Sequence, residues 1–182
     1  MVPPAAARYE VDLYLLMTMI CHDAVKRAVL EHVGVSEGEA NDARERVSAL
    51  LEFGPRQFGN FARLIGRDLP SDPDSALVYR TKLWPRLDFV VVGVGGYWRS
   101  AKLQRAQGES ATVVVADPQD IAPLTYTVDE LRAGFGPLVE GDSMAPYEEF
   151  LFEANGFRYG ATASWGFVQR VRNWAGDHQA LR

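Results

Sequence analysis

The stretch that decides the fold is A-P-Y-E-E-F-L-F-E-A-N-G-F-R-Y-G-A, residues 145–161. It places two adjacent carboxylates, Glu148 and Glu149, beside bulky apolar side chains, and an Asn-Gly pair then leads into a second aromatic run. In a strand, successive side chains alternate between faces, so Tyr147, Glu149 and Leu151 would share one face of a sheet. The Asn-Gly pair would then form a hairpin turn, because both residues tolerate a positive φ.

A helix explains the same residues equally well. Pro146 suits a first helical turn, and the two glutamates would complement the N-terminal end of the helix dipole. Apolar side chains also recur at helical spacing and end at a glycine, namely Tyr147, Phe150, Leu151, Ala154 and Gly156. Local chemistry therefore leaves both structures open, and the helix is at least as well supported as the strand.

Length and charge limit the class of protein. The chain has 182 residues, of which 47% are hydrophobic and 24% charged, which predicts one folded domain with its own core. A formal net charge of −5 disfavours general nucleic-acid binding, since such binding depends on neutralising phosphates. Four arginines near the C-terminus could still form a local basic patch, and a solvated face is the simpler interpretation for Arg158, Arg170, Arg172 and Arg182.

The cysteine and histidine content excludes two kinds of site. A single cysteine, Cys21, allows no disulfide within the chain and no cysteine-rich zinc site. The three histidines are not at ligand spacing, so we expect no metal site. We also expect no membrane span and no signal peptide, because the apolar run 13–21 is short and follows acidic residues. The sequence therefore favours a cytoplasmic protein.

The N-terminal part of the chain reads as helical. Apolar residues recur at helical spacing over 9–33, which predicts one long helix. Ser36 and Glu39 have the spacing of a capping box, so a second helix is expected over 37–53, and a third over 56–65 follows Gly-Pro. These three helices form the predicted N-terminal layer, residues 1–75.

Strand signals begin at residue 76. Strands are expected over 76–80, 87–94 and 111–116, and helices over 97–107 and 127–139, whereas 163–174 fits either structure. Gly93, Gly95 and Gly96 lack the pattern of a phosphate-binding loop and favour a bulge or a close backbone approach. The predicted fold class is therefore α+β, in which the helical layer packs on a small mixed β-sheet (residues 76–182) within a single domain.

Three polar residues are candidates for a common site, and they occur in a fixed order along the chain. Arg80 ends a short predicted strand, Ser100 follows a second, and Glu149 lies near the end of the chain. The segments L-V-Y-R (77–80), Y-W-R-S-A (97–101) and the 146–159 region together resemble the arginine-serine-glutamate branch of the ADP-ribosyltransferases. The chain departs from the family pattern at Thr81, where glycine is usual, at Trp98-Arg99 in the serine motif, and at Tyr147 in the paired-acid motif.

The resemblance implies a site and a cofactor. Glu149 would stabilise the oxocarbenium character that develops on the ribose when the nicotinamide bond of NAD breaks. The resemblance also implies that Arg80 holds the phosphates of NAD, that Ser100 orients Glu149, and that Tyr97, Trp98 or Tyr147 contacts the cofactor.

Two other functions remain open from the sequence. One is a non-enzymatic interaction or immunity-type protein, whose aromatic residues would serve a core and a partner surface. The other is a small-molecule pocket enzyme of specialised metabolism. The protein acceptor or binding partner and the oligomeric state are not determined by the sequence.

Overall fold

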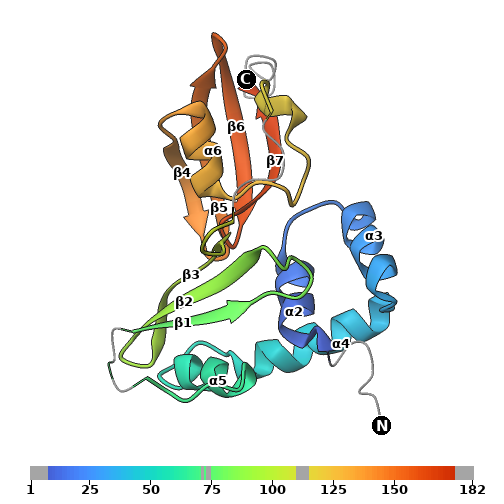
Figure 1. The fold of residues 1–182 in the computed structure, drawn as a ribbon, viewed down its shortest axis with the longest axis vertical. Helices are drawn as coiled ribbons and strands as arrows, with labels where there is room; N and C mark the ends of the chain where they lie inside the picture. The colour runs from blue at the N-terminus through green and yellow to red at the C-terminus, as the bar shows by residue number, and fades with distance from the viewer. Residues whose placement is uncertain (1–7, 71, 73–74, 110–114, 175–182) are drawn as a thin grey trace, which may run out of the picture. The chain divides into compact units, whose positions relative to one another are not determined.

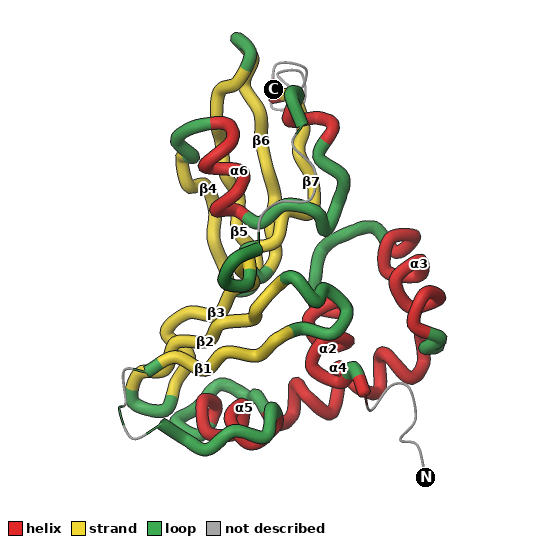
Figure 2. Tube along the Cα trace, in the orientation of Figure 1, coloured by secondary structure: helices red, strands yellow, loops and turns green. Residues whose placement is uncertain are grey.

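The computed structural model describes residues 8–70, 72, 75–109 and 115–174, which form helices and two antiparallel sheets (Figures 1 and 2). The α+β fold class is thus confirmed, but two antiparallel sheets replace the predicted small mixed sheet. Contacts divide the chain into an N-terminal unit, Met1–Thr18 with His22–Ala106, and a C-terminal unit, Met19–Cys21 with Gln107–Arg182. The boundary drawn at residue 75 from the sequence falls inside the N-terminal unit.

The helices of the N-terminal unit are α2 (Glu10–Thr18), α3 (Asp23–Val33), α4 (Glu37–Leu50) and α5 (Gln57–Leu64). The capping box of α4 is confirmed, since Ser36 and Glu39 exchange both of its hydrogen bonds. The single helix predicted over 9–33 is wrong: α2 ends at Thr18, and the backbone N–H of Ile20 donates to Ser164 Oγ at 3.2 Å. A tertiary contact therefore interrupts a helical pattern. In the part of the chain that the structure describes, no helix has the length and hydropathy needed to cross a bilayer.

The sheet of the N-terminal unit contains β1 (Ala76–Arg80), β2 (Leu87–Val94) and β3 (Tyr97–Arg105), in that order and antiparallel. The first two strands match the sequence prediction. The helix predicted over 97–107 is wrong, because this segment is β3 and pairs with β2 along its length. Its Ala, Lys, Leu, Gln and Arg residues favour helix locally, and the hairpin pairing across Gly95-Gly96 overrides that preference.

Helix α5 packs against this sheet (Figure 1). The fully buried ring of Phe61 meets Phe89 on β2 and Trp98 on β3 edge to face, with ring centroids 5.7 Å and 5.4 Å apart. Phe58, one turn earlier on the same helix, lies against Gly93, where an added Cβ would come within 2.7 Å of the ring. Aromatic contacts and one small residue thus fix the helix on the sheet.

The C-terminal unit contains a short 3-10 helix, η1 (Pro118–Asp120), then α6 (Val128–Phe135) and an antiparallel sheet of β4 (Val139–Met144), β5 (Tyr147–Ala154), β6 (Phe157–Ser164) and β7 (Phe167–Asn173). The capping box of α6, Thr127 with Glu130, is confirmed. The strands form a meander in chain order (Figure 2). Of the strand predicted over 111–116, residues 111–114 lie outside the described residues.

The stretch 145–161, which decides the fold, forms a hairpin of β5 and β6. Phe150 and Phe152 are buried while Glu149, Leu151 and Glu153 are exposed, which is the alternation expected of a strand. The turn residues Asn155 and Gly156 have φ values of 53° and 78°, so the strand interpretation is confirmed and the helix alternative is wrong. The buried side joins a core that includes Leu131, Tyr159, Ala161 and Val168.

Candidate functional site

Arg80 and Ser100 lie on the sheet of the N-terminal unit. Arg80 Nε contacts Asp88 Oδ1 at 2.6 Å, directly across from it in the β1–β2 register. Ser100 pairs with Val92, four residues further along β2 than Asp88. Because a strand rises about 3.3 Å per residue, the two positions are separated by about 13 Å along the sheet. The sheet therefore does not bring this arginine and this serine together.

The two predicted aromatic residues of the N-terminal unit differ in environment. Trp98 packs on Phe61 and Phe89, so most of its indole serves the core. Tyr97 is 38% exposed and its ring centroid lies 5.2 Å from that of Phe53, which is 81% exposed. Of the two, Tyr97 has the more exposed ring.

Tyr147 and Glu149 lie on β5 of the C-terminal unit. Both face the side of the sheet opposite the aromatic core, where Tyr147 is half-buried and Glu149 is exposed opposite Thr162. Their functional roles, like those of Arg80, Ser100, Tyr97 and Trp98, stay predictions.

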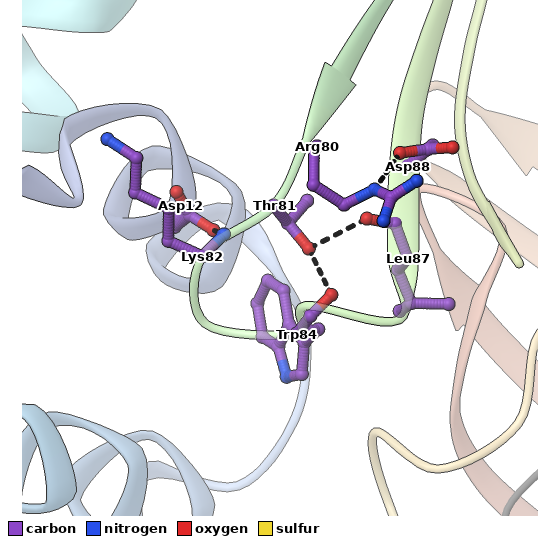
Figure 3. A network of polar contacts seen from close by, with 7 residues as sticks. All are labelled: Asp12, Arg80, Thr81, Lys82, Trp84, Leu87 and Asp88. Carbon is purple, nitrogen blue, oxygen red and sulfur yellow. Dashed lines mark hydrogen bonds and ion pairs between the residues drawn. The ribbon is translucent and has the colours of Figure 1, made fainter. Parts of the chain in front are cut away.

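A polar network surrounds the loop between β1 and β2 (Figure 3). Asp12 on α2 is fully buried, and its carboxylate accepts hydrogen bonds from the backbone N–H groups of Lys82 and Leu83, at 2.7 Å and 2.9 Å, and from the Tyr79 hydroxyl. Burial raises the pKa of Asp12 above its ordinary value, although these hydrogen bonds and the charge of Lys82 oppose the shift. Burial, together with the neighbouring Asp12 charge, also raises the pKa of Tyr79. Because these contacts of Asp12 tie α2 to β1 and to the loop that follows it, we interpret the network as structural.

Thr81 belongs to the same loop. Its hydroxyl lies within hydrogen-bond distance of the carbonyl oxygens of Trp84 and Leu87, the latter at 3.1 Å, and its side chain is buried (Figure 3). Thr81 stands where the ADP-ribosyltransferase pattern usually has glycine. Its side chain has a structural role here, because its hydroxyl bonds across the loop that joins β1 and β2.

A cavity of about 570 Å³ lies in the N-terminal unit, between α5, the segment that follows it, and the β2–β3 turn. Gly59 and Ala62 of α5 contribute to its lining, together with Leu69, Pro70 and the turn glycines. Its size falls within the range of small-molecule sites. Small residues on the helix leave this space open, since larger side chains at these positions would fill it.

The sequence builds the two ends of the cavity through local backbone rules. At the end of α5, Gly66 has a φ of 67°, its N–H bonds to the Arg63 carbonyl, and the Arg67 N–H bonds to the Ala62 carbonyl at 2.8 Å. This is a Schellman motif, and it places Arg67 directly after the last helical turn. At the other side, the Phe58 N–H donates to the Gly96 carbonyl at 2.9 Å, which holds the turn against the start of the helix.

Charge distinguishes this cavity. Three arginines line it, Arg56, Arg63 and Arg67, against one acidic residue, Asp72. Arg63 donates to Asn60 Oδ1, and Asn60 in turn donates to the Leu50 carbonyl at the end of α4. Among the residues that the structure describes, Arg56 and Arg67 make no ion pair. Guanidinium groups over a largely apolar floor suit an organic anion.

The sequence predictions do not include these arginines. The available signal was Arg56 and Arg63 seven residues apart, which puts both on one side of a helix, with Gly59 and Ala62 between them. The glycines were interpreted correctly as a bulge and a close approach: the β2–β3 register shifts at Gly93, and a Cβ on Gly96 would lie 1.9 Å from the Pro55 oxygen.

Comparison with known proteins adds no assignment: no family model, no curated protein and no solved structure matches the chain. Within the described residues, no group of His, Cys, Asp or Glu side chains is arranged to hold a metal ion. The geometry of the cavity is therefore the basis for a functional hypothesis.

Proposed function

We propose that the N-terminal unit binds a small organic anion, a carboxylate or phosphate ester with an apolar body, in the cavity beside α5. The single observation behind this proposal is the gathering of three arginines around one apolar-floored cavity of about 570 Å³. Charge-assisted hydrogen bonds from guanidinium groups would orient the anionic group. Gly59, Ala62 and Leu69 would contact the apolar part.

The proposal extends one of the alternatives left open by the sequence, a small-molecule pocket. It requires that the cavity discriminate by charge, because neutral molecules of the same shape would leave the arginines without a partner. Binding should also weaken with added salt, since the three guanidinium groups are exposed and screening reduces their attraction.

A calorimetric titration with matched probes tests the proposal. Octanoate and phenyl phosphate carry an anionic group on an apolar body, and 1-octanol is the neutral counterpart of octanoate. We expect at least one of the two anions to bind at millimolar concentration or below, 1-octanol to bind more weakly, and Arg63→Ala to weaken the anion by about tenfold.

The matched control is Arg132→Ala, which removes an exposed arginine of the C-terminal unit whose guanidinium group pairs with Asp129. This variant should bind both anions as the unaltered protein does. Absence of binding by both anions, or equal binding of octanoate and 1-octanol, would overturn the proposal.

A second candidate, the NAD-using transfer of ADP-ribose to an unknown acceptor, is favoured by one observation. The segment that carries Glu149 is a strand followed by a glycine turn and the Phe157-Arg158 pair, as the resemblance implies. The engagement of Arg80 with Asp88 weighs against it, because that guanidinium already has an anionic partner.

The transferase hypothesis has its own test. If Glu149 carries the chemistry, Glu149→Gln should abolish release of nicotinamide from NAD while NAD affinity stays within about tenfold. Nicotinamide release that is unchanged in this variant would exclude the assignment, and so would the absence of both NAD binding and NAD turnover in the unaltered protein. Glu153→Gln, an exposed glutamate on the same face of β5, is the matched control.

A further inference from the structure

The arginines of the cavity are not clustered at one point. Arg56 immediately precedes α5, and Arg63 lies in its last turn, seven residues later. With 1.5 Å of rise per residue, their Cα atoms are about 10 Å apart along the helix axis. At 3.6 residues per turn, seven residues complete almost two turns, so the two side chains leave the same side of the helix.

The floor between these positions is uncharged. Gly59 and Ala62 come from the intervening turns of α5 and line the same cavity. Arg67, which follows the Schellman turn, joins Arg63 at the C-terminal end of the helix. The cavity therefore has one arginine at the first end of α5, an apolar middle, and two arginines at the other end.

We propose that the ligand of this cavity is a dianion with an anionic group at each end of an apolar body, bound along α5. The inference rests on the proposed function and narrows its ligand class. A molecule with one anionic group would satisfy only one end and leave the cation at the opposite end in water. An extended α,ω-dicarboxylate or a phosphorylated carboxylate places its charges as the arginines are placed.

The two ends of the cavity also differ in positive charge. Arg63 and Arg67 together create a higher positive potential than Arg56 alone, so a ligand with a single carboxylate should place it at the C-terminal end of α5. The second anionic group of a dianion would then reach Arg56. This assignment predicts which variant affects which ligand.

Octanoate and octanedioate are the probes, because they share one chain length and differ in the number of carboxylates. We expect octanedioate to bind about fivefold more tightly than octanoate, the upper range for one additional exposed ion pair. Arg56→Ala should weaken octanedioate until it binds no more tightly than octanoate, whereas Arg63→Ala should weaken both probes. Arg132→Ala serves again as the control, and thermal melts verify that each variant is folded.

Each outcome has a separate meaning. If octanoate binds and depends on Arg63, but octanedioate binds no more tightly or its advantage persists in Arg56→Ala, the dianion inference is wrong and the anion pocket stands. If octanoate and phenyl phosphate both fail to bind, the proposed function itself is wrong. A steeper loss of affinity with salt for octanedioate than for octanoate would support the second charge contact.

Discussion

The two antiparallel sheets have similar hairpin turns, but the turns differ in their contacts with the rest of the protein. Both contain hairpins whose two turn residues have positive φ, Gly95-Gly96 between β2 and β3 and Asn155-Gly156 between β5 and β6. A Cβ on Gly96 would lie 1.9 Å from the Pro55 oxygen, whereas a Cβ on Gly156 would meet nothing within 4 Å. One turn thus requires glycine for conformation and for space, and the other for conformation alone.

The difference extends to how each sheet is anchored. The N-terminal sheet is tied to its helices by polar backbone contacts at both ends of its strands, through Asp12 at the β1–β2 loop and through Gly96 at the β2–β3 turn. The C-terminal sheet relies on an aromatic core under β5 and β6, which includes Phe150, Phe152 and Tyr159. Since the tie at Gly96 also lines the cavity, changes there should affect stability and ligand binding together.

Gly96→Ala should have the largest effect. The added methyl would overlap the Pro55 backbone, which cannot move as a side chain would, and the positive φ of 89° adds conformational strain. We expect a loss of about 3 kcal/mol or more in the free energy of unfolding, measured by urea denaturation. Octanoate binding should weaken as well, because Gly96 lines the cavity. A loss below about 1 kcal/mol would show that the turn is not held against Pro55.

Gly93→Ala tests the contact between α5 and β2. Its methyl would lie 2.7 Å from the ring of Phe58, which is buried, so either the ring or the helix must shift. We expect a loss of about 1–3 kcal/mol. Combining Gly93→Ala with Phe58→Leu should cost less than the sum of the two single changes, since the smaller side chain leaves room for the methyl. Strict additivity in this double-mutant cycle would contradict the packing.

Asp12 tests the other anchor. Asp12→Ala should lower the free energy of unfolding by about 1–3 kcal/mol, because two backbone N–H groups lose their acceptor. Asp12→Asn keeps an acceptor without a buried charge. Because burial raises the folded-state pKa of Asp12 above the ordinary 3.8, its stabilising contribution is complete below about pH 3.8 and is lost as pH rises through the raised value.

The unaltered protein should therefore lose stability relative to Asp12→Asn as pH increases from about 3.5 upward. Urea denaturation of both proteins at several pH values measures this difference. A difference that stays constant with pH would show that the hydrogen bonds to the carboxylate offset its burial, and a change in the opposite direction would show that they outweigh it.

Some of this architecture could be predicted because the decisive interactions are local. The capping boxes at Ser36 and Thr127 place both helix starts within one residue, since the capping side chain and its partner are three residues apart in sequence. The Asn155-Gly156 turn is likewise contained in two residues. The predictions that failed depend on distant partners: β3 is set by pairing with β2, and the break after Thr18 accompanies a bond from Ile20 to Ser164.

The candidate site was harder to predict for the same reason. The cavity requires small residues on α5, a turn thirty residues later and arginines on both sides of a Schellman motif, and no short motif contains all three. Arg80 ends β1 as the sequence predicts, whereas Tyr97, Trp98 and Ser100 lie on β3 in place of the predicted helix. Arg80 is also engaged by Asp88, a partner eight positions away that only the hairpin register reveals. The sequence pattern thus located the end of β1, but the partner of the Arg80 side chain depends on which residue lies opposite it in the sheet.

Gly156→Ala should have the smallest effect and completes the comparison of the two turns. With no atom within 4 Å of the new methyl, only the positive φ of 78° opposes the substitution, which corresponds to about 1–2 kcal/mol. Gly156→Asn should recover much of this loss, because asparagine tolerates the left-handed conformation, whereas Gly96→Asn should not, because its Cβ still meets Pro55. If asparagine recovered the same amount of stability at position 96 as at position 156, contact with Pro55 would not limit substitution at Gly96. The close approach of the β2–β3 turn to Pro55 would then be wrong.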